Sequence, residues 1–139
     1  HKLEDLLPRV DIISVHAPLM SSTLHLLGKA EFELMQPHAW LINTSRGALI
    51  DERALIDALE SGQIAAAALD VFEPEPPSPD NPLFMMDNVI VSPHRAFYTQ
   101  DGLERLSRSV TDQVLKALQG ERPAHIVNPE VWNHFVSKQ

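Results

Sequence analysis

Short apolar runs alternate along the chain with segments in which apolar positions recur at helical spacing. The apolar runs at residues 10–15, 39–43, 64–72 and 88–91 are partly β-branched, which predicts buried strands. Residues 29–36 and 52–60 predict amphipathic helices, and residues 100–119 predict a long one. Strands that alternate with helices indicate right-handed crossovers and a parallel sheet covered on both faces. The pattern therefore predicts an α/β fold with a doubly wound parallel sheet and a long C-terminal helix.

Capping residues mark the ends of the predicted helices. Asp51 and Thr99 stand at N-cap positions, from which a side-chain oxygen accepts a hydrogen bond from a free backbone N–H of the first turn. Gly62 and Gly120 stand just past the last apolar positions, where glycine adopts the left-handed conformation that ends many helices. The proline-rich run at residues 73–79 cannot continue a strand and predicts a stiff loop.

Composition and charge narrow the functions open to the chain. The chain has 139 residues, of which 44% are hydrophobic and 22% charged, and this fits one globular domain or part of one. Its sequence contains no apolar run long enough to span a bilayer, and we expect no secretory leader. The net charge of −8 argues against sequence-independent nucleic-acid binding, which needs basic patches. The absence of cysteine excludes disulfides and fits a reducing compartment, so we expect a cytoplasmic protein.

Charged or titratable side chains that could act in catalysis or binding follow three of the predicted strands. Arg46 stands just past the second strand and His94 just past the fourth, while Asp70 and Glu75 follow the third. Because the ligand crevice of a parallel sheet lies outside the carboxyl ends of the strands, we expect these side chains to face one crevice. A glutamate fixes the tautomer of a histidine and favours its protonated form, and an arginine fork fits a carboxylate. The set suits proton transfer at the oxygen of a 2-oxo or 2-hydroxy acid, with a cofactor carrying the hydride.

Each of these features also has a structural interpretation. His94 would then be a turn histidine after a proline, and Asp70 would cap the end of its strand. The loop at residues 73–79 is interpreted as a rigid support for Glu75, with a peptide ligand for an aromatic groove as the alternative. The histidines at positions 1, 25, 38, 125 and 134 are dispersed without metal-ligand spacing, so no metal is assigned.

Three ordered sequence blocks resemble the signatures of the D-isomer-specific 2-hydroxyacid dehydrogenases. They are Asn-Thr-Ser-Arg-Gly at 43–47, Ala-Leu-Asp-Val-Phe at 68–72 with Glu-Pro at 75–76, and Pro-His at 93–94. His-Ala-Pro-Leu at 16–19 is similar to the loop that lines the adenosine side of the family's cofactor site. The resemblance covers nearly the whole chain. It implies a Rossmann-type oxidoreductase that uses NAD, with NADP left open, and acts on small D-2-hydroxy acids or 2-oxo acids.

The resemblance also implies roles for individual residues. Arg46 would bind the carboxylate and carbonyl of the substrate, and His94 would be the acid/base with Glu75 as its partner. Asp70 would contact the nicotinamide carboxamide. The further cofactor contacts that the resemblance carries over are His16, Pro18, Thr44 and Ser45. The full-length protein is expected to be a homodimer, without direct nucleic-acid or membrane partners.

One family signature is absent from the chain. The glycines are scattered, and no G-x-G-x-x-G occurs after a strand. Residues 1–120 therefore resemble the second half of a Rossmann-type NAD-binding domain, lacking the G-x-G-x-x-G half. Residues 121–139 resemble a C-terminal tail that returns toward a missing substrate domain, with Trp132 and Phe135 available to dock. We expect this chain alone to bind NAD poorly and to turn over little substrate.

An aromatic pair stands next to the candidate acid/base, and the sequence leaves its role open. The family more often has a small residue or glycine at position 97, whereas this chain has the aromatic pair Phe97 and Tyr98. The aromatic form is similar to D-lactate dehydrogenases and to C-terminal-binding-protein corepressors. The pair would either narrow the pocket for small substrates or pack the following helix. Three hypotheses remain: a dehydrogenase represented by its catalytic half, a corepressor-like NAD-sensing binding protein, and a catalytically inert fragment.

Overall fold

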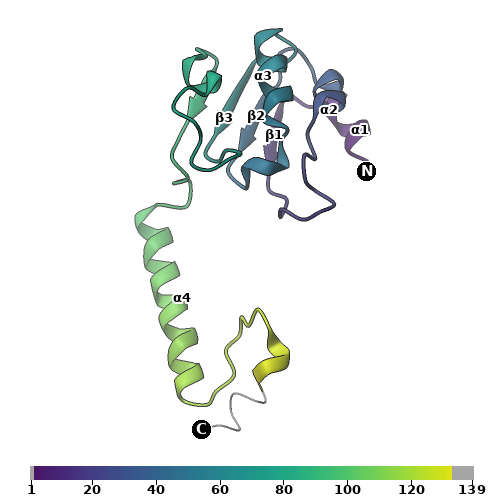
Figure 1. The fold of residues 1–139 in the computed structure, drawn as a ribbon. Coiled ribbons are helices and arrows are strands. Elements are labelled where there is room, and N and C mark those ends of the chain that lie inside the picture. The colour runs from purple at the N-terminus through teal and green to yellow at the C-terminus, as the bar shows by residue number, and fades with distance from the viewer. Residues whose placement is uncertain (1, 133–139) are drawn as a thin grey trace. The chain divides into compact units, whose positions relative to one another are not determined.

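The computed structural model describes residues 2–132 and divides the chain into two compact units, His1–Ala96 and Phe97–Gln139 (Figure 1). Residue 1 and residues 133–139 lie outside the description. The histidines at positions 1 and 134 and the predicted docking residue Phe135 are therefore not described.

The first unit is built on a four-stranded parallel sheet. Its strands are β1 (Ile12–Val15), β2 (Trp40–Asn43), β3 (Ala66–Leu69) and β4 (Val89–Val91), and they lie side by side in that order. The sequence predicted all four strands, and their order confirms the α/β fold class. The third strand is shorter than the predicted run at 64–72. The strand ends at Leu69, and Asp70 N adds one further bond to Asn43 O beyond it.

Helices α2 (Lys29–Leu34) and α3 (Glu52–Glu60) connect successive strands and pack on one face of the sheet (Figure 1). The short helix α1 (Leu3–Leu6) and a following 3₁₀ turn precede β1. The predicted cap of α3 is confirmed, since Asp51 Oδ1 accepts from Ala54 N at 3.1 Å. Alternate strand residues point into a core that these helices close, and the fully buried members include Leu7, Phe32, Leu41, Leu49, Leu55, Ile64 and Leu83.

The other face of the sheet carries exposed apolar side chains. Ile12 is 64% exposed, Trp40 44% and Ile90 63%, although all three lie in strands. Each alternates with a residue that faces the α2–α3 side, as the two-residue period of a strand requires. Within residues 2–96 the prediction of a sheet covered on both faces is therefore correct for one face only. Crossovers that all run in the same direction along a sheet place their helices on one side.

The second unit contains the predicted long helix, α4 (Gln100–Leu118). Thr99 caps it by accepting from Gly102 N at 3.0 Å, and Gly120 follows its end with a φ of 77°. None of its residues is buried, and its neighbours in the unit are the residues that follow it, such as His125, whose N–H donates to Gln113 at 3.2 Å. Within this unit the helix therefore groups with the residues that follow it. No helix among residues 2–132 has the length and apolar character to cross a membrane.

Candidate active site

The carboxyl ends of β2, β3 and β4 lie next to one another at one edge of the sheet. Asn43 is in register with Leu69, and Leu69 is in register with Val91. The pairing continues past the strands, because Asp70 N donates to Asn43 O and Ser92 N donates to Leu69 O, both at 2.9 Å. The three segments with the predicted site residues therefore leave the sheet at the same edge.

His94 and Glu75 form a hydrogen-bonded pair at this edge. His94 Nδ1 lies 2.9 Å from Glu75 Oε1, and the two side chains are 40% and 39% exposed. A carboxylate can only accept, so Nδ1 carries the hydrogen and Nε2 is the nitrogen left for other chemistry. The backbone of His94 is left-handed, with φ of 54°, which is uncommon for a residue other than glycine.

Asp70 holds the segment that carries His94. Its Oδ1 accepts from Arg95 N and its Oδ2 from Ala96 N, both at 2.8 Å, and the Ser92 hydroxyl donates to Oδ1 as well. The main-chain oxygen of Asp70 accepts from His94 N at 2.8 Å. These bonds fix the turn around His94 and hold its left-handed backbone.

The carboxyl group of Asp70 has an altered acidity. The side chain is buried, which by itself raises the pKa. Hydrogen bonds from Ser92, Ala96 and Arg95 favour the charged form, with a smaller contribution from His94, and together they bring the pKa below its ordinary value. Asp70 is therefore an ionised anchor beneath the candidate acid/base.

Arg46 is held at the end of β2 by a side chain to which the sequence analysis gave no role. Asn43 is buried, accepts from Ser45 N at 3.0 Å and donates to Arg46 O at 2.9 Å. The exposed Arg46 guanidinium donates to Ser45 O at 2.7 Å. A buried amide at the end of an apolar run was the sequence signal for this role, because such a group needs internal partners.

The loops after β2 and β3 touch each other at Gly47. A β-carbon at this position would lie 1.9 Å from the carbonyl oxygen of Phe72, well inside any contact distance. Glycine is thus required next to Arg46 so that the two loops can meet. This contact brings the arginine segment against the segment that leads to Glu75.

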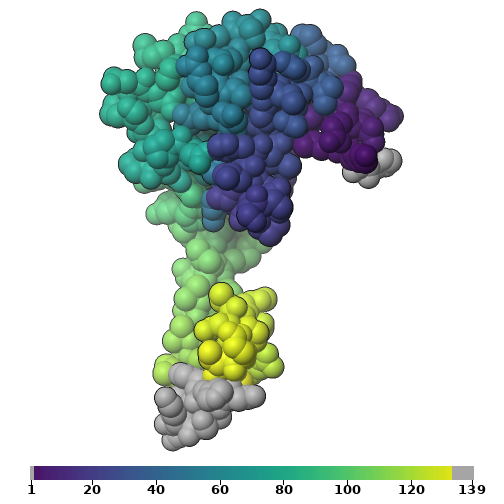
Figure 2. Space-filling view, turned by 45° about the vertical axis from the view of Figure 1, so that its right-hand side comes forward, coloured from purple at the N-terminus to yellow at the C-terminus, as the bar shows by residue number. Residues whose placement is uncertain are grey.

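The predicted cofactor contacts lie on the loops after β1 and β2. Ser45 Oγ donates to Ala17 O at 2.9 Å, which joins the two loops between His16 and Pro18. His16, Pro18 and Thr44 are exposed, and Figure 2 shows the segment after β1, in violet-blue, at the surface of its unit. Of the candidate residues, the structure thus joins Glu75 to His94, sets Asp70 beneath His94, and joins the Ser45 loop to the His16 loop.

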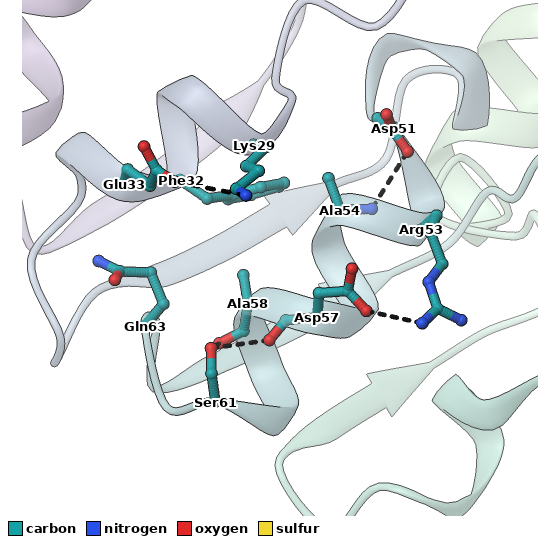
Figure 3. A pocket seen from close by; sticks show the side chains of 10 residues that line it. All are labelled: Lys29, Phe32, Glu33, Asp51, Arg53, Ala54, Asp57, Ala58, Ser61 and Gln63. Atoms are coloured by element: carbon teal, nitrogen blue, oxygen red, sulfur yellow. Dashed lines mark hydrogen bonds and ion pairs between the residues drawn. The ribbon is translucent and has the colours of Figure 1, made fainter.

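A hollow of about 370 Å³ between α2 and α3 lies apart from these residues (Figure 3). Its cations are paired along their own helices: Arg53 lies 3.0 Å from Asp57, and Lys29 lies 3.9 Å from Glu33. None of the predicted site residues lines it. Over residues 2–132, no three His, Asp or Glu side chains are grouped so that they could hold a metal ion.

In open parallel α/β sheets, ligands bind outside the carboxyl ends of the strands, and the histidine–glutamate pair lies at this edge. Residues 1–96 match the family model described as "D-isomer specific 2-hydroxyacid dehydrogenase, NAD binding domain". The chain therefore belongs to the D-isomer-specific 2-hydroxyacid dehydrogenase family, as the resemblance predicted. The matched range ends where the first compact unit ends.

Curated relatives and solved structures agree with this assignment. The chain is 46% identical over 129 residues to a glyoxylate reductase of Aeropyrum pernix, covering 93% of the chain and 38% of the relative. It is 44% identical to a D-3-phosphoglycerate dehydrogenase of Methanocaldococcus jannaschii, covering 91% of the chain and 24% of the relative. The structure of D-lactate dehydrogenase with NAD⁺ from Lactobacillus jensenii matches with a TM-score of 0.84 at 35% identity, over 91% of this chain and 42% of that one.

Proposed function

We propose that the protein is an NAD-dependent oxidoreductase that interconverts small 2-oxo acids and D-2-hydroxy acids, with Arg46, Glu75 and His94 as its catalytic set. The observation that carries the proposal is the 2.9 Å pair between His94 Nδ1 and Glu75 Oε1, at the same sheet edge as Arg46. The chain spans less than half the length of the relatives it matches, so the activity proposed is that of the gene's full product.

His94 is the proton donor in this proposal. With Nδ1 bonded to Glu75, the proton for the substrate is held on Nε2 of the imidazolium. Nε2 gives this proton to the carbonyl oxygen of the 2-oxo acid during reduction and takes it back from the hydroxyl during oxidation. Glu75 fixes the tautomer and stabilises the positive charge on the ring. When bound, NADH supplies the hydride that the reduction requires.

Arg46 binds the substrate in this proposal. A guanidinium presents paired N–H donors to a carboxylate in a planar fork, which orients as well as attracts the acid. A donor that also reaches the carbonyl oxygen stabilises the negative charge that develops there. The buried Asn43 keeps the backbone of this turn in place.

The chain's residues fit one part of NAD. His16, Pro18, Thr44 and Ser45 stand on two joined loops at the carboxyl edge, where dinucleotides bind to parallel sheets. An ionised carboxylate has about four lone-pair sites, and three internal donors already occupy three of those of Asp70. We therefore propose that Asp70 acts mainly by holding the His94 turn and reaches the nicotinamide carboxamide with its remaining capacity.

The substrates proposed are short 2-oxo acids such as glyoxylate, hydroxypyruvate and pyruvate. Relatives that match more than nine-tenths of the chain include glyoxylate reductases, a glyoxylate/hydroxypyruvate reductase and a D-3-phosphoglycerate dehydrogenase. The proposal of short substrates rests on the reductases among them. The matches named as reductases and dehydrogenases also favour an enzyme over the corepressor-like alternative. Phe97 and Tyr98 pack edge to face with ring centroids 6.0 Å apart, and their role in substrate selection stays a prediction.

The test is the oxidation of NADH by the gene's full product with a series of 2-oxo acids. We expect His94→Ala to lower kcat by about 10²–10⁴-fold while the Kd for NADH stays close to that of the wild type. We expect Arg46→Ala to raise KM for the oxo acid and to lower kcat as well, because the arginine acts on both bound substrate and transition state.

His38→Ala is the matched control, because His38 is also an exposed histidine paired with a carboxylate, Asp11, at 2.7 Å. It should leave both kinetic constants unchanged. Near-normal turnover by His94→Ala would contradict the acid/base assignment. Binding of NADH without reduction of any acid in the series would favour the corepressor-like alternative.

A further inference from the structure

The loop that carries Glu75 contains a second glutamate paired with a second histidine. His25 Nε2 lies 2.7 Å from Glu73 Oε2, and these side chains are 44% and 39% exposed. Glu73 and Glu75 are separated only by Pro74, and each pairs with a histidine from a different part of the chain. The ring of Pro74 locks the one φ angle of the residue between the two glutamates, which limits how far the backbone at residue 75 can shift without the backbone at residue 73.

His25 is itself fixed to the segment that follows Arg46. Its N–H donates to Ala48 O at 2.8 Å, and Leu27 N donates to Leu49 O at 3.1 Å. His25 also shares the left-handed backbone of His94, with a φ of 50°; among the described residues other than glycine, these two histidines have positive φ. His25 thus lies between two segments: its backbone bonds to the segment that follows Arg46, at Ala48, and its side chain bonds to the loop that carries Glu73 and Glu75.

Glu52, at the start of α3, fastens both ends of the same loop. Glu52 Oε1 accepts from Asn81 Nδ2 at 2.7 Å, and Glu52 Oε2 accepts from Glu73 N at 3.4 Å. The loop is therefore anchored to Glu52 through the backbone N–H of Glu73 and through the side chain of Asn81. Between these anchors, the Glu75 side chain forms the hydrogen bond to His94. Because Glu75 follows Glu73 by two residues, we infer that the conformation at residue 73 controls where the Glu75 side chain lies.

We propose that the His25–Glu73 pair positions Glu75 against His94, and that His25 and Glu73 are therefore positioning residues for proton transfer. The proposal deepens the proposed function and rests on it for its kinetic consequence. The pair sets the distance between the segment that follows Arg46 and the loop that carries Glu75. Loss of the pair lets residues 73–75 shift, and the His94 ring then loses its partner at Nδ1.

The structural part is tested on the 139-residue chain by NMR of its histidine rings, without substrate or NADH. His94 is assigned by the loss of its signals in His94→Ala. We expect His25→Ala and Glu73→Ala, each of which removes one partner of the pair, to move the ring ¹⁵N shifts of His94 toward those of a histidine without a partner. His25→Gln retains a donor near the former Nε2 position and is expected to restore most of the wild-type shifts.

The comparison of His25→Ala with His25→Gln isolates the hydrogen bond. Alanine and glutamine pay a similar cost in the left-handed backbone at this position, so a difference between the two variants comes from the side chain. His38→Ala, which breaks the 2.7 Å pair with Asp11 next to the amino ends of β1 and β2, should leave the His94 signals unchanged. Amide spectra of each variant establish that the unit is folded.

The kinetic part uses the gene's full product. We expect His25→Ala to lower kcat by about ten- to a hundred-fold, as a misplaced reacting group does, with KM for the oxo acid changed by much less. His25→Gln should recover most of the loss. His94 signals that stay unchanged in folded His25→Ala and Glu73→Ala would overturn the proposal. Signals that move as expected, together with normal turnover by His94→Ala, would preserve the positioning and refute the proposed function instead.

Discussion

At the scale of single residues, Asp70 shows how a buried charge organises a site. Three donors converge on its carboxylate, two from the backbone of Arg95 and Ala96 and one from Ser92. Each donor would be left unsatisfied without the carboxylate, and the turn that presents His94 would lose its fixed geometry. The candidate acid/base His94 is therefore held by a residue whose described bonds all lie within the fold.

Asp70→Asn should destabilise the first unit by about 1–3 kcal/mol, because the new amide turns a donor toward a backbone N–H. The loss should depend on pH. A carboxyl group with a lowered pKa stabilises the folded state above the ordinary pKa of 3.8, and this contribution is lost as the pH falls through the folded-state value. Urea unfolding of wild type and variant at several pH values checks this, with the exposed Asp80→Asn as control. A difference that does not shrink below about pH 4 would contradict the ionised anchor.

At the scale of elements, the site depends on how closely two strand ends approach each other. The turn after β2 and the segment after β3 meet at Gly47, where the Phe72 carbonyl occupies the space of a side chain. Main chain lies on both sides of this contact, so neither segment relaxes by a simple rotamer change. The same contact keeps Arg46 next to the segment that leads to Glu75.

Gly47→Ala should therefore lower the stability of the unit by about 3 kcal/mol or more. Gly28→Ala is the matched control, because its β-carbon would lie 3.5 Å from the nearest atom, Glu31 Oε2, at an ordinary contact distance. Thermal unfolding followed by circular dichroism compares the two variants. A Gly47→Ala protein as stable as Gly28→Ala would mean that the two loops do not meet at this point.

At the scale of the whole molecule, the hydrophobic core belongs to the first unit. Every member of the core cluster lies between Leu7 and Leu83, whereas α4 has no buried residue. Because burial of apolar surface is the dominant favourable term in folding, the first unit should hold most of the stability. The family model matches the same range, residues 1–96.

A chain that ends at Ala96 should therefore fold by itself. We expect a single cooperative thermal transition with a midpoint within about 5 °C of that of the full chain, which corresponds to roughly 1 kcal/mol. A chain that ends at Glu60 lacks core residues such as Ala67, Leu69 and Leu83 and should show no such transition. Failure of the longer piece to unfold cooperatively would show that residues beyond 96 complete the core.

The sequence by itself determined the elements of this protein and the residues of the candidate site. Strands and helices follow from apolar periods of two and 3.6 residues, and the caps Asp51 and Thr99 from local hydrogen-bonding chemistry, so both can be predicted from neighbouring positions. The rule that strand ends meet at one edge was enough to suggest Arg46, Glu75 and His94 as a set.

The tertiary structure alone decided how these residues are held. His25 and Glu73 are 48 positions apart, Asp70 and Ala96 are 26 apart, and Gly47 meets Phe72 across two loops. No local period encodes such contacts, because they depend on which strands become neighbours and how closely their loops pack. The same reason explains why the sequence analysis treated His25 as one of several dispersed histidines, while the fold brings it to the loop that carries Glu75.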